Sequence, residues 1–307
     1  MFDTAFSGTF TAGITAKSAF AKGVKKFFES LLESIPSQKE ELLAVLQLDG
    51  SKNPFEGVSI QLTTTLTNYA YIICAIVFMI EFLKYTIKIE GVKLEYVAGL
   101  GFKFAVARSA LDIGRDLLLA ITATANSLVL SAVNTQAVYY AYDSSGKLVS
   151  QSVTGGISEN IEAIKTLINK TLEDAGMFDA IVPLITLSLP FIAIKVIMFI
   201  GIIMAYGRMF EMTIYQIMYP LPCGMMLLDQ GRIPKRFFAS YCACALQGPI
   251  MIMSVSLFEG FMTRAVAEAE TVQDLSAVAF TTLMAALMML MGMLKSGQWA
   301  NRVLGES

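Results

Sequence analysis

The chain has 307 residues, of which 55% are hydrophobic and 16% are charged, and it contains no histidine. Soluble domains carry about 25% charged residues, so this composition favours a helical membrane protein. The absence of histidine excludes Ser-His-Asp and Cys-His catalysis and histidine-ligated zinc or haem. A net charge of −2 argues against binding of nucleic acid by bulk electrostatic attraction.

Residues 1–64 are predicted to form an amphipathic helical segment ahead of the first membrane span. Large apolar residues recur at helical spacing between Ala19 and Ile35, with lysines and glutamates on the other face. Such a helix lies at the membrane interface or docks on a partner, and its balanced charges favour docking. Pro36 is expected to end it, and a second short helix is expected at Gln38–Leu48.

Residues 65–134 are predicted to hold the first two membrane helices, since about 20 mostly apolar residues cross a bilayer. The first span is Leu66–Tyr85, and a longer helix follows at about Tyr96–Val133. The second half of the longer helix is uncharged and suits lipid. Its first half is expected to protrude or to face other protein because it carries Lys103, Arg108, Asp112, Arg115 and Asp116.

Residues 135–180 are predicted to form an extracytoplasmic insertion. The stretches VYYAY and KLVSQSV read as two short strands around a glycine-containing turn. An amphipathic helix is expected after Gly155-Gly156, with Ser158 as its cap.

Residues 181–294 are predicted to form the C-terminal membrane bundle. Its first span is expected at Ile181–Tyr206, ending at Gly207-Arg208, and an apolar segment follows at Phe210–Leu228. Two prolines and a glycine interrupt this segment, so it is expected to break or to re-enter the same side of the membrane. The residues of this predicted hinge are Pro220, Pro222 and Gly224.

Two further spans are predicted at Phe237–Phe261 and Leu275–Leu294, before a cytoplasmic tail at 295–307. The fold class is therefore an all-α polytopic membrane protein with about five transmembrane helices plus one broken or re-entrant segment. Basic residues concentrate in cytoplasmic loops. If the broken segment turns back, the N-terminus is outside, the C-terminus is inside, and the basic stretches of the linker, the 229–236 loop and the tail are all cytoplasmic.

Charged residues within spans are candidates for a pore or an ion path, because a charge at mid-membrane costs about 2.5–3.5 kcal/mol on insertion scales. Lys195 lies nearest to mid-depth. It either faces an assembly interior or aqueous path and pairs with Glu81 or Glu211, or it reaches the interface or locks helix packing. Arg208 completes this candidate set, and Glu81 and Glu259 lie near span ends, where an interfacial position is favoured.

Ser240, Cys244 and Gly248 form a strip of small residues at four-residue spacing, which suits close helix packing in lipid. The strip serves either a subunit contact or packing within the chain, and packing within the chain is favoured. The methionines of the last span favour core packing over a copper site. No catalytic set, metal-ligand cluster or phosphate-binding loop occurs, so the sequence predicts no enzyme activity and no cofactor.

Four short motifs carry a resemblance to a known family. They are Arg208-Met209-Phe210-Glu211, Tyr219-Pro220-Leu221-Pro222, Lys235-Arg236-Phe237-Phe238 and Ala245-Leu246-Gln247-Gly248-Pro249. Together they resemble the TrbL-type polytopic inner-membrane components of conjugative type IV secretion systems. The resemblance covers about Ile181–Leu294 well, and the preceding span and loop in layout only.

The resemblance implies a non-enzymatic channel or scaffold subunit in the cytoplasmic membrane of a bacterium. The implied partners are further copies of the chain, membrane lipid, other components of the secretion machine including its cytoplasmic ATPases, and transiently a DNA–relaxase substrate. Two other hypotheses remain open. One is a secondary transporter of a small solute that uses Lys195 and the proline break. The other is a membrane anchor for cytoplasmic proteins.

Overall fold

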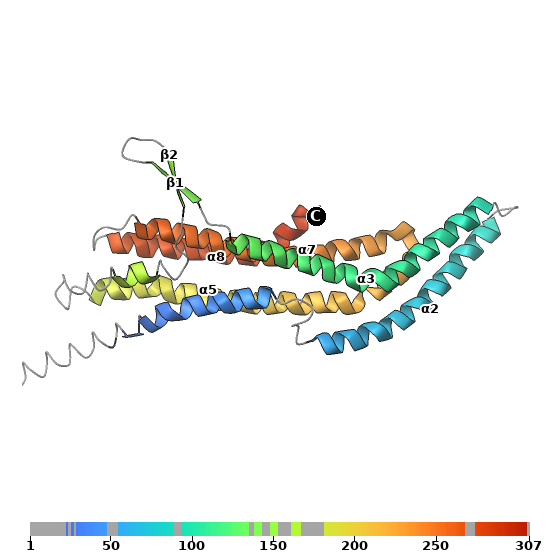
Figure 1. Ribbon diagram of the computed structural model, residues 1–307, viewed down its shortest axis with the longest axis horizontal. Coiled ribbons are helices and arrows are strands. Elements are labelled where there is room, and N and C mark those ends of the chain that lie inside the picture. Colours follow the sequence, from blue (N-terminus) through green and yellow to red (C-terminus); the bar gives the residue numbers. More distant parts are fainter. Residues whose placement is uncertain are drawn as a thin grey trace, which may run out of the picture. The chain divides into compact units, whose positions relative to one another are not determined.

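The structure is a computed structural model that describes residues 23, 26–27, 29–47, 55–88, 94–134, 138–142, 148–152, 161–166, 181–267 and 274–305. In this part of the chain, five helices are long and apolar enough to cross a membrane. They are α2 (Glu56–Lys88), α3 (Leu94–Asn134), α5 (Ile181–Met218), α7 (Arg232–Ala267) and α8 (Asp274–Val303), as Figure 1 shows. The predicted all-α polytopic class is confirmed.

These helices are longer than a membrane span requires. They contain 33, 41, 38, 36 and 30 residues, which correspond to about 45–62 Å at a rise of 1.5 Å per residue. The hydrocarbon core of a bilayer is only about 30 Å thick. Each helix therefore extends past that core or tilts strongly within it.

Helix α2 begins ten residues before the predicted span, at Glu56. Its polar first turns stay helical because the hydroxyls of Thr64 and Thr65 donate to the carbonyls of Ile60 and Gln61. Helix α3 agrees with the predicted Tyr96–Val133 to within two residues at each end.

The predicted end of the third span at Gly207-Arg208 is wrong. Helix α5 continues without interruption to Met218. A glycine keeps its backbone N–H group, so Gly207 leaves the hydrogen-bond ladder intact. Most of the predicted Phe210–Leu228 segment is thus the last part of α5 together with a short helix, α6 (Pro220–Gly224).

The break itself lies at the predicted prolines. Pro220 occupies the first turn of α6, where its missing N–H group would have no helical partner. A 3₁₀ helix, η1 (Leu228–Gly231), follows, and Gly231 has a φ of 77°, which favours glycine. Tyr215 near the end of α5 packs on Phe237 near the start of α7, with ring centroids 5.4 Å apart, so the chain reverses direction here.

Pro36 does not end the N-terminal helix, contrary to the prediction. Residues 29–46 form one continuous helix that includes it. An interior proline costs about 3 kcal/mol, whereas a fully buried leucine or isoleucine contributes about 1.5–3 kcal/mol. Leu32, Ile35 and Leu42 are all buried, so the apolar face on both sides of Pro36 outweighs the lost hydrogen bond.

The predicted hairpin is present between α3 and α5. Strands β1 (Val138–Tyr142) and β2 (Leu148–Ser152) pair antiparallel, with Val138 opposite Ser152 and Tyr142 opposite Leu148. Of the helix predicted after it, residues 161–166 are helical, and Ile161 and Ile164 are buried. The remainder of that helix lies outside the described residues, as do the chain before residue 23 and the linker lysine Lys93.

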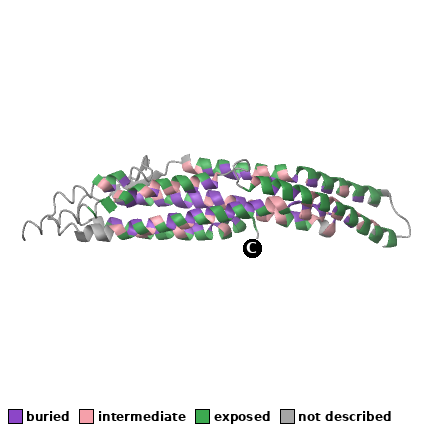
Figure 2. Ribbon diagram, turned by 90° about the horizontal axis from the view of Figure 1, so that it is seen from below, coloured by how far each residue is buried: buried purple, intermediate pink, exposed green. Residues whose placement is uncertain are grey.

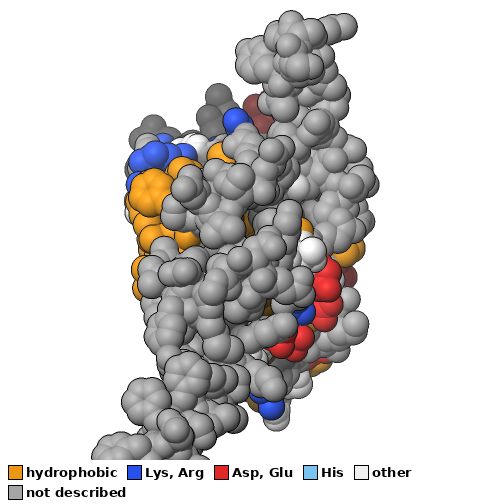
Figure 3. All heavy atoms as spheres, turned by 90° about the vertical axis from the view of Figure 1, so that its left-hand side faces the viewer, with side chains coloured by type: hydrophobic (Ala, Val, Ile, Leu, Met, Phe, Trp, Pro, Cys, Tyr) orange, Lys and Arg blue, Asp and Glu red, His pale blue; other side chains and the backbone are white. Residues whose placement is uncertain are grey.

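The chain divides into two compact units. The first comprises Met1–Leu43, Val133–Ile203 and Met253–Met293. In it the N-terminal helix packs within the chain itself, because Lys39 forms an ion pair with Glu259 of α7. Contact of this helix with lipid or with a partner stays a prediction. Acidic and basic side chains lie side by side on the face shown in Figure 3, and Lys165 pairs with Glu33 at 3.3 Å.

The second unit comprises Ala44–Ala132, Met204–Ile252 and Leu294–Ser307. Its core is lined by α2, α3, α5, α6 and α7, and includes Cys74, Leu111, Leu118, Cys223 and Tyr241. Figure 2 shows buried positions on the inner sides of these helices and exposed positions on their outer sides.

Candidate functional site: a buried arginine clamp between α5 and α7

Arg208 is the most deeply buried charged side chain in the part of the chain that the structure describes, with 5% of its surface exposed. It lies inside α5, in the second unit. Its Nε donates to the carbonyl of Cys244 at 3.1 Å, and its Nη2 donates to the carbonyl of Ala245 at 3.0 Å. The guanidinium therefore bridges α5 to the backbone of α7.

Pro249 explains why a carbonyl of α7 is free to accept this bond. A proline has no N–H group, so the carbonyl four residues before it loses its helical donor. That carbonyl belongs to Ala245. Arg208 supplies a donor at the position where the α7 ladder lacks one.

Gly248 provides the space that the guanidinium occupies. A Cβ atom on residue 248 would lie 2.6 Å from Cζ of Arg208, which is closer than real Cβ contacts come. Any larger residue would displace the arginine from α7. The Gly248-Pro249 pair thus provides both the room and the acceptor for Arg208.

The arginine has no anionic partner among the residues that the structure describes. Helix carbonyl dipoles stabilise its charge in place of a carboxylate, and hydrogen bonds to charged groups are about twice as strong as neutral ones. Glu211, one turn further along α5, is exposed. Because an arginine stays protonated in proteins, this arrangement holds two helices together and transfers no proton.

Tyr241 is a second polar centre in the same unit, and its side chain is fully buried. Its hydroxyl lies 2.6 Å from Oγ1 of Thr122 and 3.1 Å from the carbonyl of Leu118, both on α3. It also accepts a bond from Nε2 of Gln216 on α5 at 3.1 Å. One phenol thereby connects α3, α5 and α7.

The break docks onto α3 through Tyr219, which precedes the predicted hinge, and onto α2 through the hinge residue Gly224. The hydroxyl of Tyr219 donates to the carbonyl of Leu111 at 3.1 Å, and its ring packs against Gly114. Gly224 lies against the backbone of α2, where an added Cβ atom would be 2.9 Å from the carbonyl oxygen of Ala70. The proline break is a packed corner of the second unit.

The other predicted charges are placed differently from Arg208. Glu81 forms an ion pair with Lys84 at 2.7 Å, one turn along α2. Lys195 is partly buried on the part of α5 that belongs to the first unit, whereas Glu81 and Glu211 belong to the second. A pairing of Lys195 with either glutamate stays a prediction.

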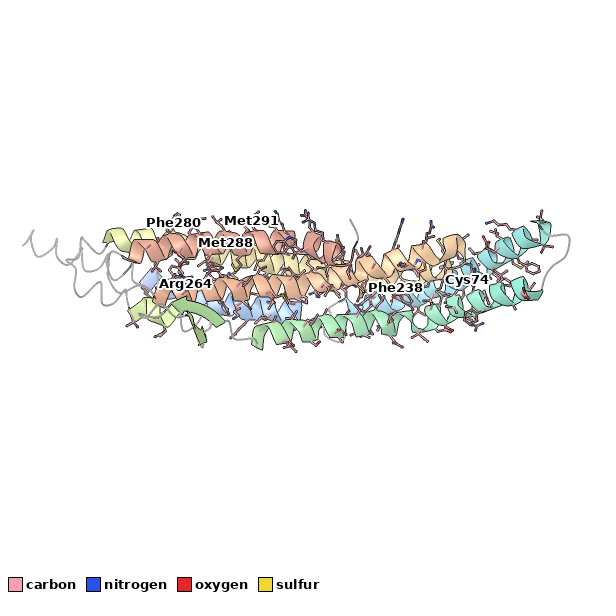
Figure 4. All side chains as sticks on the ribbon, turned by 90° about the horizontal axis from the view of Figure 1, so that it is seen from above. Cys74, Phe238, Arg264, Phe280, Met288 and Met291 are labelled. Atoms are coloured by element: carbon pink, nitrogen blue, oxygen red, sulfur yellow. The ribbon has the colours of Figure 1, made fainter. Side chains whose placement is uncertain are left out.

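In the predicted small-residue strip, Cys244 and Gly248 lie against Arg208 of α5. Ser240, one turn earlier on α7, is partly buried. The methionines of α8 divide between two environments. Met289 and Met293 are buried, whereas Met288 and Met291 lie with Phe280 on the outer side of the helix (Figure 4).

Sequence reasoning identified Arg208 as a candidate pore charge and missed its role as a clamp. It missed the buried phenol of Tyr241 as well. The available signal was the Gly248-Pro249 pair inside an apolar helix. The proline leaves the carbonyl four residues before it without a helical donor, and the glycine allows a neighbouring side chain to come close to the backbone.

Five spans and a charge clamped by backbone carbonyls define the class: a multi-pass helical membrane protein. No group of three metal-ligating Cys, Asp or Glu residues occurs within the described ranges. Comparison with known families, with curated proteins and with solved structures finds no match.

We expect Gly248→Ala to destabilise the protein because the new methyl group must displace Arg208. Loss of one or both guanidinium bonds lowers the free energy of unfolding by about 2 kcal/mol or more, since bonds to charged groups contribute roughly 1.5–3 kcal/mol each. Thermal unfolding of the purified protein in detergent measures this. Gly207→Ala is the matched control, because residue 207 adjoins Arg208 and an added Cβ atom there meets open space. Equal unfolding midpoints for the two variants would contradict the clamp.

We also expect Arg208→Leu to be coupled to Pro249→Ala. The leucine leaves the Ala245 carbonyl without a donor, and an alanine at position 249 restores a backbone N–H group four residues away. The destabilisation by Arg208→Leu should therefore be smaller by about 1–3 kcal/mol in the Pro249→Ala background, the cost of a buried unsatisfied group. A double-mutant cycle on unfolding in detergent measures the coupling. Pro190→Ala, in the first unit, is the control that should show simple additivity.

Proposed function

We propose that the chain is an integral channel or scaffold subunit of a conjugative type IV secretion machine, and that it helps a DNA–protein substrate cross the cytoplasmic membrane of a bacterium. The five spans and the absence of histidine suit a membrane subunit without catalytic machinery. Energy for transport would come from cytoplasmic ATPases of the same machine.

One observation carries this proposal. The motifs that resemble the TrbL-type family are separate in sequence, yet two of them form one buried contact. Arg208 of the first motif donates to Ala245 of the last, beside Gly248 and Pro249. The Tyr219-Pro220-Leu221-Pro222 motif forms the corner between them. Residues that share a structural contact are the ones a family pattern would retain together, which supports the resemblance.

Assembly from several copies is part of the proposal. Helix α2 presents large apolar side chains that the rest of its unit leaves exposed, including Ile72, Ile76 and Met79. Extended apolar faces of this kind meet lipid or another subunit. Further copies of the chain, the other secretion components and lipid are the proposed partners.

If the proposal holds, deletion of the gene abolishes transfer of the mobile element and leaves growth unchanged. In the complemented strain, Lys195→Leu should abolish transfer, because a channel needs the charge at mid-depth, while Lys195→Arg should retain it. Mating assays measure both effects, with membrane levels of each variant as the control. Normal transfer by the deletion strain would overturn the proposal. Full transfer by Lys195→Leu would favour the anchor hypothesis, and solute uptake by the purified protein in liposomes would favour the transporter.

The proposed orientation places the N-terminus outside and the C-terminus inside. Reporter fusions after Lys235 should therefore report the cytoplasm, and fusions at residues 143–147 should report the outer compartment. The reason is that basic residues concentrate on the cytoplasmic side of a membrane. The chain reverses direction at Pro220–Gly224, so the basic residues before and after this corner lie on the same side. An outer location for residues 229–236 would contradict this orientation.

A further inference from the structure

The antiparallel packing of α2 and α3 fixes which parts of the two helices share one level. The rings of Phe78 and Phe104 lie with their centroids 4.9 Å apart. The hydroxyl of Tyr71 bonds to the carboxylate of Asp112. In both pairs the residue numbers sum to 182 or 183, so residues 66–85 of α2 lie beside about 97–116 of α3. Figure 1 shows the two helices as a hairpin.

This register brings together two stretches of opposite character. Residues 66–85 are the apolar part of α2, with Cys74 on its buried side (Figure 4). The stretch beside them is the charged half of α3. The outer face of α2 at this level consists of exposed large side chains: Tyr69, Ile72, Ile76, Met79, Ile80 and Leu83.

Helix α3 has three distinct faces at this level. Residues such as Ala107, Leu111 and Leu118 pack into the core of the unit. A second face is mostly apolar and exposed, formed by Phe102, Val106, Ile113 and Leu117, with the exposed Lys103 at its edge. A third face is charged: Arg108, Asp112 and Asp116 recur every four residues, so they lie on one side of the helix, and all three are exposed.

The charged exposed face of α3 and the apolar exposed faces of α2 and α3 need different surroundings. Exposed charges in hydrocarbon are costly, whereas a row of exposed isoleucines suits lipid. The sequence allowed the charged half of α3 to protrude while Leu66–Tyr85 spans the bilayer. The register excludes that combination, because the two segments lie at the same level.

We propose that the charged face of α3 borders a water-filled lumen while the apolar faces of α2 and α3 at the same level border lipid. The helical hairpin of α2 and α3 then separates the lumen from the lipid, and further copies of the chain complete the lining of the lumen. This inference rests on the proposed channel function and names its lining. The lining residues are Arg108, Asp112 and Asp116, with the partly buried Arg115 at the edge of the charged face.

The geometry of the charged face fits contact with water. The Arg108 guanidinium lies 6.0 Å from the centre of the Tyr71 ring, and Asp112 bonds to the same tyrosine. Two of the charges are thus held along the surface of the hairpin by one side chain of α2. With Arg115 included, the charges of this face sum to zero, so the face exerts little long-range attraction on a polyanion.

Paired cysteine variants of the full-length protein in native membranes test this lining. Asp116→Cys lies on the charged face, and Ile113→Cys lies one turn away on the apolar face at the same level. A charged, membrane-impermeant thiol reagent requires water and a thiolate. We expect it to label Asp116→Cys at least about tenfold faster than Ile113→Cys, because apolar surroundings suppress the thiolate. The unsubstituted protein gives the background, which comes from the partly exposed Cys242, since Cys74, Cys223 and Cys244 are buried.

The outcomes separate the alternatives. In detergent both sites should react at similar rates, which shows that both variants are folded and reactive. Equal rates in membranes would place the whole hairpin in water and overturn the lumen. Protection of both sites would indicate a dry protein contact and would also overturn it. Thiol labelling does not depend on DNA transfer. A labelling result can therefore contradict the proposed lumen while the mating assay supports the channel function, and a mating result can contradict the channel function while labelling supports the lumen.

Discussion

The second unit depends on one interaction, the contact of a buried guanidinium with two carbonyls of a proline-containing helix. Each partner would be unfavourable alone. A buried cation without acceptors and a buried carbonyl without a donor both cost free energy, and the glycine leaves α7 without a side chain at that point. Together they form a closed arrangement in which Arg208 supplies the donor, Pro249 frees the acceptor and Gly248 allows the approach. The contact also fixes the axial position of α5 against α7.

The rest of the unit follows from that axial position. With α5 and α7 fixed, Gln216 and Tyr241 meet, and the phenol reaches Thr122 and the carbonyl of Leu118 on α3. The corner at α6 then places Tyr219 against α3 and Gly224 against α2. The buried polar groups of Arg208, Tyr241 and Tyr219 are each satisfied by an atom of a neighbouring helix, and these contacts constrain how the helices pack. Such contacts specify geometry more than they add stability.

The charged residues of the second unit differ in what surrounds them. Arg208 is engaged by the backbone, and Glu81 by Lys84. On α3, Arg108, Asp112 and Asp116 remain exposed. The described part of this unit therefore holds charges that other groups of the chain engage and charges that face outward. Only the second kind can line a path for water or substrate.

The sequence by itself determined the class, the five spans and the site of the break, because these depend on composition, on runs of apolar residues and on prolines. It also identified strands β1 and β2 from two short strand-like stretches around a glycine-containing turn. It failed at Pro36, where burial of the flanking apolar residues outweighs the lost hydrogen bond, and at Gly207-Arg208, where the glycine leaves the helical hydrogen-bond ladder intact. The role of Arg208 and the level of the α3 charges were decided only by the tertiary structure. A charge has no intrinsic role in a span: its role depends on which carbonyl, side chain or medium the neighbouring helices place around it.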